Sequence, residues 1–139
     1  EAETFDSAMR ERFPKVVQWR DEIRDLGSSG VLLDNGFGRK MRPTPQRAYT
    51  QAPALMGQGT ARDLMMEGIL RLPLEMVPML RVIVHDEVVL SVPEDIVEDV
   101  EHQLLEALQF PWAPPGAERA ITVRAGLAKR GRNWADCYR

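Results

Sequence analysis

The feature that most constrains the fold is a pair of short alternating apolar runs between Met79 and Val92. Successive residues of a strand point to opposite faces of a sheet, so each run predicts a strand with one apolar face. Three polar residues separate the runs, so the two strands are expected to form a hairpin around a tight turn. The first run is Leu80, Val82 and Val84, the turn is His85-Asp86-Glu87, and the second run is Val88, Leu90 and Val92.

Helical spacing of apolar residues predicts two helices at the start of the chain. Pro14 interrupts the pattern, and proline fits the first turn of a helix better than its interior. We therefore expect one helix that ends near Arg12 and a second from Pro14 to Asp25. The sequence Gly-Ser-Ser-Gly at 27–30 predicts a flexible turn after them.

Two more helices are predicted, one on each side of the central hairpin. The clearer one runs from Thr60 to Leu72, with a single apolar stripe and a plausible i,i+4 pair between Glu67 and Arg71. The other is marked by apolar residues at helical spacing over 97–108, with Pro93 in its first turn. Pro43, Pro45 and Pro53 are expected to keep the stretch before Thr60 irregular.

A second, smaller hairpin is predicted over 31–42. Its apolar start is followed by Asn35-Gly36, a strong turn signal because both residues tolerate positive φ. The returning strand carries a basic arm, which we define as Arg39, Lys40 and Arg42. With a last strand over 120–125, the order of elements predicts an α+β fold with an antiparallel sheet, organised as a single unit over 1–139.

Composition limits the classes of protein that this chain can represent. With 139 residues, of which 44% are hydrophobic and 28% charged, it has the composition of one soluble globular domain. The single cysteine, Cys137, excludes an internal disulfide framework and a multi-cysteine zinc site, and it suits a reducing cytoplasm. A net charge of −3 argues against a protein that coats nucleic acid through bulk positive charge, but it leaves room for a local basic face.

Two neighbouring carboxylates, Asp86 and Glu87, are the chemically most suggestive residues of the sequence. Acidic oxygens held on a rigid hairpin are what a hard cation such as Mg²⁺ requires, and two such ions can catalyse phosphoryl transfer. The alternative is a solvated polar turn, which is the commoner role of an isolated Asp-Glu pair. His85 alone is more typical of a structural residue than of a ligand or base.

The run Gln58-Gly59-Thr60 offers a second candidate site at the expected start of a helix. A glycine there could bring backbone close to a ligand, and a glutamine can read the acceptors of a DNA minor groove. The alternative is an ordinary helix N-terminus with Thr60 near the cap.

Together these motifs resemble the C-terminal palm of family A DNA polymerases, the bacterial DNA polymerase I type that is also found in many phages. Two runs are similar to that family's glutamine helix and to its metal-binding hairpin, called motif C: QGTARDLMMEGILRLP and VIVHDEVVLSVPED. The resemblance extends to RERFPKVVQWRDEIRDLGSSG, to GVLLDNGFGRKMRP, and to the closing strand and tryptophan within 123–134. It therefore covers almost the whole chain and favours a phage-type member.

The resemblance implies roles for individual residues. Asp86 corresponds to the motif C aspartate that binds the two catalytic Mg²⁺ ions, and Glu87 to the adjacent acid that supports the site. His85 corresponds to a histidine at the primer terminus, and Gln58 to a glutamine that contacts the primer-template minor groove. The basic arm corresponds to a hairpin near the nucleic acid, although a solvated surface is an equally common role for such residues.

The chain also departs from the family pattern. It lacks the upstream motif DYSQIE that supplies the other metal carboxylate, and it lacks the nucleotide-binding fingers helix. A family asparagine four residues before the glutamine is replaced by Ala54, or by Gln51 if the segment is aligned on Pro53. We therefore expect an incomplete polymerase fold, from a naturally split enzyme or a fragment, with an isolated chain that does not extend a primer.

The implied function is template-directed transfer of deoxynucleotides, with primer-template DNA, deoxynucleoside triphosphates and the remaining polymerase segment as partners. Three other functions stay open. The chain could be a non-catalytic DNA-binding module, a structural subunit that completes another chain's fold, or a metal-dependent nuclease. The last is disfavoured because no further acidic motif accompanies Asp86 and Glu87.

Overall fold

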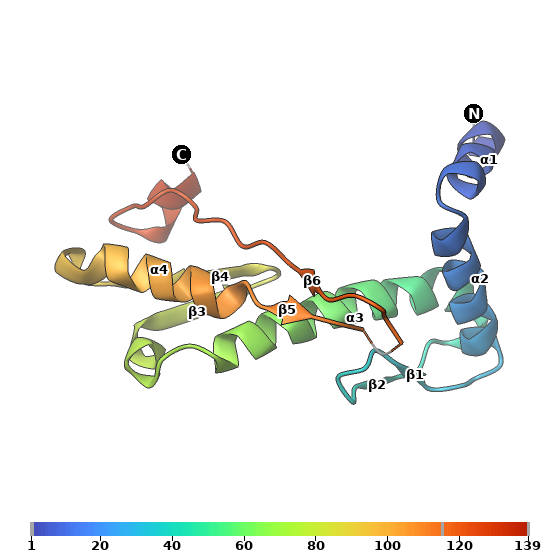
Figure 1. Ribbon diagram of the computed structural model, residues 1–139, viewed down its shortest axis with the longest axis horizontal. Helices are drawn as coiled ribbons and strands as arrows, with labels where there is room; N and C mark the ends of the chain where they lie inside the picture. The colour runs from blue at the N-terminus through green and yellow to red at the C-terminus, as the bar shows by residue number, and fades with distance from the viewer. Residues whose placement is uncertain (1, 115, 139) are drawn as a thin grey trace. The chain divides into compact units, whose positions relative to one another are not determined.

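A computed structural model describes residues 2–114 and 116–138 of the chain (Figure 1). The internal contacts divide the chain into two compact units, Glu1–Thr60 and Ala61–Arg139, and each is described by itself. The assignment of residues 1–139 to one palm domain stays a prediction. No helix in the described part of the chain is long and apolar enough to cross a membrane.

The first unit opens with two helices, as the position of Pro14 predicted. Helix α1 spans Ala2–Arg12, and α2 spans Pro14–Ser28. The predicted turn at 27–30 begins too early, because Gly27 is a buried helical residue. A Cβ at Gly27 would lie 2.8 Å from the Pro43 side chain and 3.0 Å from that of Ala52, so the glycine permits a close approach that prolongs the helix.

The hairpin predicted over 31–42 is present but short. Strand β1 (Leu33–Asp34) pairs antiparallel with β2 (Lys40–Met41), and Gly36 and Gly38 adopt positive φ in the connecting loop. Leu33 and Met41 form a buried cluster with Ala52, against which Ile23, Leu55 and Met56 pack. The hairpin is therefore fixed by its apolar face rather than by a long ladder of hydrogen bonds.

The expectation of an irregular stretch before Thr60 is wrong. A 3₁₀ turn at Pro45–Arg47 leads into α3, which spans Ala48–Leu70 and contains Pro53. A proline inside a helix leaves the carbonyl four residues earlier without its usual donor. Here that carbonyl belongs to Tyr49, and it accepts a hydrogen bond from Arg24 Nε at 2.8 Å. The guanidinium also lies 3.5 Å from the centre of the Tyr49 ring, so Arg24 compensates for the missing helical bond.

The second unit contains the central hairpin and the predicted helix that follows it. A 3₁₀ segment at Leu74–Met79 leads into β3 (Leu80–Val84), which pairs antiparallel with β4 (Glu87–Leu90). A 3₁₀ turn at Glu94–Ile96, which Pro93 precedes, separates the hairpin from α4 (Val97–Leu108). The buried cluster of this unit consists of Leu72, Met76, Val100 and Ala107, and Leu80 and Leu90 of the hairpin pack against it.

The last strand is shorter than predicted and has an unforeseen partner. Strand β6 (Ile121–Thr122) pairs with β5 (Pro111–Trp112), a segment that the prolines assigned to a loop. A 3₁₀ turn at Trp134–Tyr138, here called η4, lies near the C-terminus. Among the described residues the strands form three separate two-stranded ladders. The α+β class is confirmed, whereas the described residues do not form the single antiparallel palm sheet that was predicted.

Two glycines of α3 are expected to respond oppositely to alanine. A Cβ at Gly68, which is buried, would lie 2.8 Å from the Leu108 side chain and 3.2 Å from its Cα, so Gly68→Ala is expected to destabilise the protein by about 1–3 kcal/mol. Gly57 has nothing within 4 Å of that position, so Gly57→Ala is expected to stabilise the helix by roughly 0.5–1 kcal/mol. Urea unfolding followed by circular dichroism measures both, and equal shifts would contradict the close approach at Gly68.

Candidate functional site

The turn of the central hairpin holds three candidate residues. His85 and Asp86 form its two-residue tip, and Glu87 is the first residue of β4, where it pairs with Val84. The predicted three-residue turn is therefore one residue shorter. His85 has φ of 53°, the only positive value among the non-glycine residues that the structure describes. A left-handed residue costs roughly 1–2 kcal/mol, and such positions are concentrated at functional sites.

The hairpin presents the turn from an anchored base. Leu80 and Leu90 pair across the ladder and pack on the buried cluster of the second unit. Val82 and Val84 are half-buried as predicted, whereas Ile83 on the opposite face is 40% exposed. His85, Asp86 and Glu87 are exposed. The arrangement therefore offers two carboxylates and an imidazole to solvent at the end of a supported hairpin.

The C-terminal tail reaches this turn. The Tyr138 hydroxyl donates a hydrogen bond to Glu87 Oε2 and accepts one from Trp134 Nε1 at 3.1 Å. The bond to Glu87 raises the pKa of Tyr138 above its ordinary value. Tyr138 was not predicted as a site residue, and no local signal in the sequence points to it, because it lies 51 positions from Glu87.

A metal ion at this turn would find only two carboxylates, those of Asp86 and Glu87. Within residues 2–114 and 116–138, no group of three or more histidine, cysteine, aspartate or glutamate side chains is arranged to hold a metal ion. Mg²⁺ is often bound through one or two carboxylates with waters and substrate phosphates completing the shell. A magnesium site at Asp86 and Glu87 stays a prediction, and these two residues would supply only part of its ligands.

The other candidates lie in the first unit. Gln58 is exposed in the interior of α3, so its predicted position at a helix start is wrong. Thr60 is likewise no cap, because its hydroxyl donates to the Met56 carbonyl at 2.6 Å within the helix. Gly59 does provide a close approach, but to protein: a Cβ there would lie 2.8 Å from Met41 Sδ and 4.0 Å from Arg39 Cδ.

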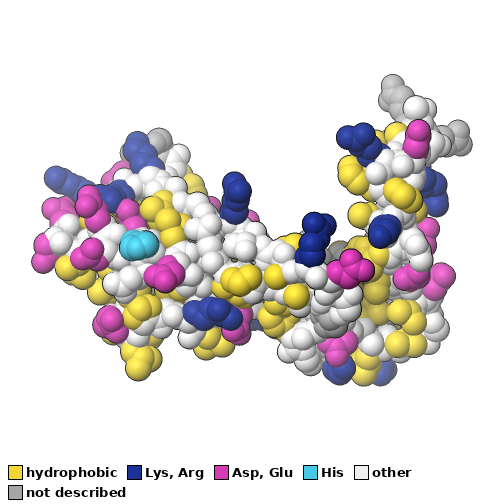
Figure 2. All heavy atoms as spheres, viewed as in Figure 1, with side chains coloured by type: hydrophobic (Ala, Val, Ile, Leu, Met, Phe, Trp, Pro, Cys, Tyr) yellow, Lys and Arg dark blue, Asp and Glu magenta, His cyan; other side chains and the backbone are white. Residues whose placement is uncertain are grey.

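Arg39 of the basic arm therefore lies beside the turn of α3 that carries Gln58 and Gly59. All three of its residues, Arg39, Lys40 and Arg42, are exposed, and Lys40 forms an ion pair with Asp34 that lowers the pKa of that carboxyl. On the face drawn in Figure 2, basic and acidic side chains are interspersed. The first unit thus places Arg39 beside Gly59, the residue after Gln58, and the second unit brings together His85, Asp86 and Glu87.

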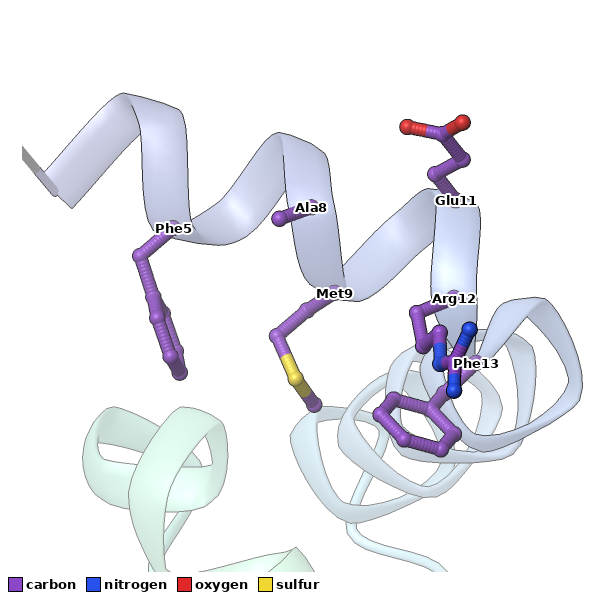
Figure 3. Close-up of a pocket in the computed structure, with 6 residues that line it drawn as sticks. All are labelled: Phe5, Ala8, Met9, Glu11, Arg12 and Phe13. Atoms are coloured by element: carbon purple, nitrogen blue, oxygen red, sulfur yellow. The ribbon is translucent and has the colours of Figure 1, made fainter.

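A hollow of about 640 Å³ lies beside α1, and none of these residues lines it. Figure 3 shows Phe5, Met9 and Phe13 projecting to one side of the helix, whereas Glu11 points away. Phe5 is 69% exposed and Phe13 is 48% exposed, so this is an open apolar face. It contains no pair of carboxylates and is not part of the candidate site.

Comparison with known proteins connects the chain to DNA polymerase I. It is 30% identical over 150 residues to the thermostable DNA polymerase I of Thermus filiformis, and 28% identical over 148 residues to those of Thermus aquaticus and a strain of Thermus thermophilus. These matches cover 96–98% of this chain but only 17% of each relative, so the chain spans about a sixth of their length. No family model and no solved structure matches it.

The chain is thus homologous to one segment of bacterial DNA polymerase I. This finding confirms the coarse part of the resemblance, a segment related to a DNA polymerase. The phage origin, the palm assignment and the roles of individual residues stay predictions.

Proposed function

We propose that this chain is the C-terminal palm segment of a DNA-directed DNA polymerase and supplies the motif C part of its active site. The observation that carries the proposal is a pair of adjacent carboxylates at the tip of an anchored hairpin, in a chain that is similar to DNA polymerase I over 98% of its length. A phage-type parent that works in the cytoplasm of a bacterial host is part of the proposal and rests on the resemblance alone.

Asp86 is the proposed metal ligand, and Glu87 supports it. The two Mg²⁺ ions, when bound, would activate the primer 3′ hydroxyl and stabilise the leaving oxygen of the α-phosphate. Asp86 stands at the turn tip and is exposed, so its carboxylate can reach an ion outside the chain. Glu87 begins β4, where ladder pairing with Val84 fixes its backbone.

The remaining candidates are proposed to hold primer-template DNA. His85 would contact the primer end from the turn tip, and Gln58 would reach the minor-groove acceptors, which a glutamine side chain can read. Arg39 lies beside Gly59, the residue after Gln58, and the exposed arginine and lysine side chains of the basic arm could contact backbone phosphates. Its effect would be local, since the whole chain carries a net charge of −3.

A separate polymerase segment is proposed to complete the site. One aspartate and its neighbour do not offset the charge of two divalent ions, so a second carboxylate motif is required. The β3–β4 ladder has two strands, and Ile83 exposes 40% of its surface. Among the described residues no third strand pairs with this ladder, so a strand that carried the other carboxylate could pair with its edge and place side chains beside Ile83.

The isolated 139-residue chain is therefore expected not to extend a primer. The assay is extension of a labelled primer-template with deoxynucleoside triphosphates and Mg²⁺, with Thermus aquaticus DNA polymerase I as the positive control. Extension by rigorously pure chain that disappears in Asp86→Ala would contradict the need for a second carboxylate motif.

Native mass spectrometry of the protein from its natural source tests the completed site. We expect a longer polypeptide, or a stoichiometric complex with a second chain that carries the other carboxylate motif. A lone species of 15.8 kDa that binds DNA without any dependence on metal would instead favour the non-catalytic DNA-binding function.

A further inference from the structure

The hydrogen bonds at the C-terminus have only one possible direction. The Trp134 indole N–H can only donate, and an ionised Glu87 carboxylate can only accept. The Tyr138 oxygen, which lies between them, must therefore accept from Trp134 and give its proton to Glu87 Oε2. The chain of donors ends on the second carboxylate of the hairpin turn.

The tail that carries Tyr138 is organised rather than free. Arg130 forms a bidentate ion pair with Glu101 of α4, with both N···O distances at 2.7 Å. The Asn133 side-chain amide donates to Asp136 Oδ2 at 2.7 Å, and the Asp136 backbone N–H donates back to Asn133 Oδ1 at 3.2 Å. The ion pair ties the tail to α4, and the Asn133–Asp136 bonds order the start of η4, both independently of Glu87.

We propose that Tyr138 is a positioning residue for Glu87, with its hydroxyl oriented by Trp134. A glutamate side chain rotates about three torsions, and a charge-assisted hydrogen bond to Oε2 favours the rotamers that bring this oxygen to the Tyr138 hydroxyl. The bond uses Oε2 alone, so Tyr138 orients Glu87 without engaging Oε1. The catalytic meaning of this arrangement rests on the proposed function, in which Glu87 supports Asp86.

The test measures the Glu87 conformation in the full 139-residue chain, without DNA or metal. In the wild type, three-bond NMR couplings about χ1 of Glu87 are expected to report one dominant rotamer. In Tyr138→Phe they are expected to average over several rotamers, and the Trp134 indole N–H resonance is expected to shift because its acceptor is lost. Tyr49→Phe is the matched control: it removes an exposed tyrosine hydroxyl from the other unit and should change neither signal.

Trypsin cleavage after Arg132 gives a second readout, and the conservative variant Glu87→Gln tests whether an accepting oxygen is sufficient. Loss of an exposed, charge-assisted hydrogen bond is expected to raise the opening rate of the tail, so cleavage of Tyr138→Phe should be about three- to tenfold faster. Glu87→Ala should match it, whereas Glu87→Gln keeps an accepting oxygen and should stay near the wild-type rate. Averaged Glu87 couplings in the wild type, or couplings and cleavage unchanged in Tyr138→Phe, would overturn the proposal.

The outcome of this experiment does not depend on whether the proposed function is correct. It needs neither DNA nor magnesium, so a Glu87 rotamer held by Tyr138 would stand even if no polymerase activity were found. Conversely, a polymerase that depends on Asp86 but whose Glu87 moves freely would retain the proposed function and lose the positioning role of Tyr138.

Discussion

Replacing Asp86 with alanine is expected to abolish primer extension by the complete polymerase assembly that contains this chain. Asp86 is exposed at the tip of the β3–β4 turn, and in the proposed function it is the metal ligand that this chain contributes. Loss of metal-based charge stabilisation is worth several kcal/mol, and each 1.36 kcal/mol is a factor of ten. The extension rate should therefore fall by about 10³-fold or more.

Two further variants separate this effect from misfolding. Asp86→Asn keeps the shape of the side chain and removes its charge, so it should be almost as defective as alanine. Asp95→Ala removes an exposed carboxylate from the 3₁₀ turn before α4 and should leave extension unchanged. Binding of primer-template in the absence of metal should be similar in all variants. Full extension by Asp86→Asn would show that Asp86 is not the metal ligand and would favour a DNA-binding role.

The parts of the fold that follow from local chemistry were predictable. Two-residue periodicity around a short polar turn predicted the β3–β4 hairpin, and Pro14 predicted the break between α1 and α2. The i,i+4 pair of the predicted Thr60–Leu72 helix also forms, since Arg71 lies 3.1 Å from Glu67 Oε1. In each case the interacting residues are close together in the sequence, so the local pattern alone was enough to predict the element.

The errors arise where a distant side chain changes a local preference. Pro53 predicted an irregular segment, but Arg24 supplies the hydrogen bond that the Tyr49 carbonyl lacks. This bond, which joins residues 25 positions apart, lets α3 begin at Ala48. Gly27 was assigned to a turn because its close packing on Pro43 cannot be read from neighbouring residues.

The residues of the candidate site also divide into those that the local sequence predicted and those that depend on distant contacts. The pair Asp86-Glu87 was recognisable because two alternating runs flank it and because a family motif contains it. Tyr138 was not recognisable, since it meets Glu87 only because the chain between these two residues folds back to the turn. Gln58 was chosen as a candidate but placed at a helix start, whereas α3 continues before it through Pro53 to Ala48.

Shortening Met76 to alanine is expected to be the most destabilising single truncation in the second unit. Its side chain is 1% exposed and packs in the cluster with Leu72, Val100 and Ala107. Truncation of a buried methionine removes transfer free energy and leaves a cavity, which together cost about 2–5 kcal/mol. The midpoint of urea unfolding should fall accordingly, with little change in the slope.

Val77→Ala is the matched control for this prediction. Val77 follows Met76 in the same 3₁₀ segment but is 52% exposed, so its truncation should change stability by no more than roughly 0.5 kcal/mol. Because Leu80 and Leu90 pack on the cluster that contains Met76, the backbone amides of β3 and β4 should also exchange faster in Met76→Ala. Equal midpoints for the two variants would mean that this cluster does not support the hairpin that presents Asp86.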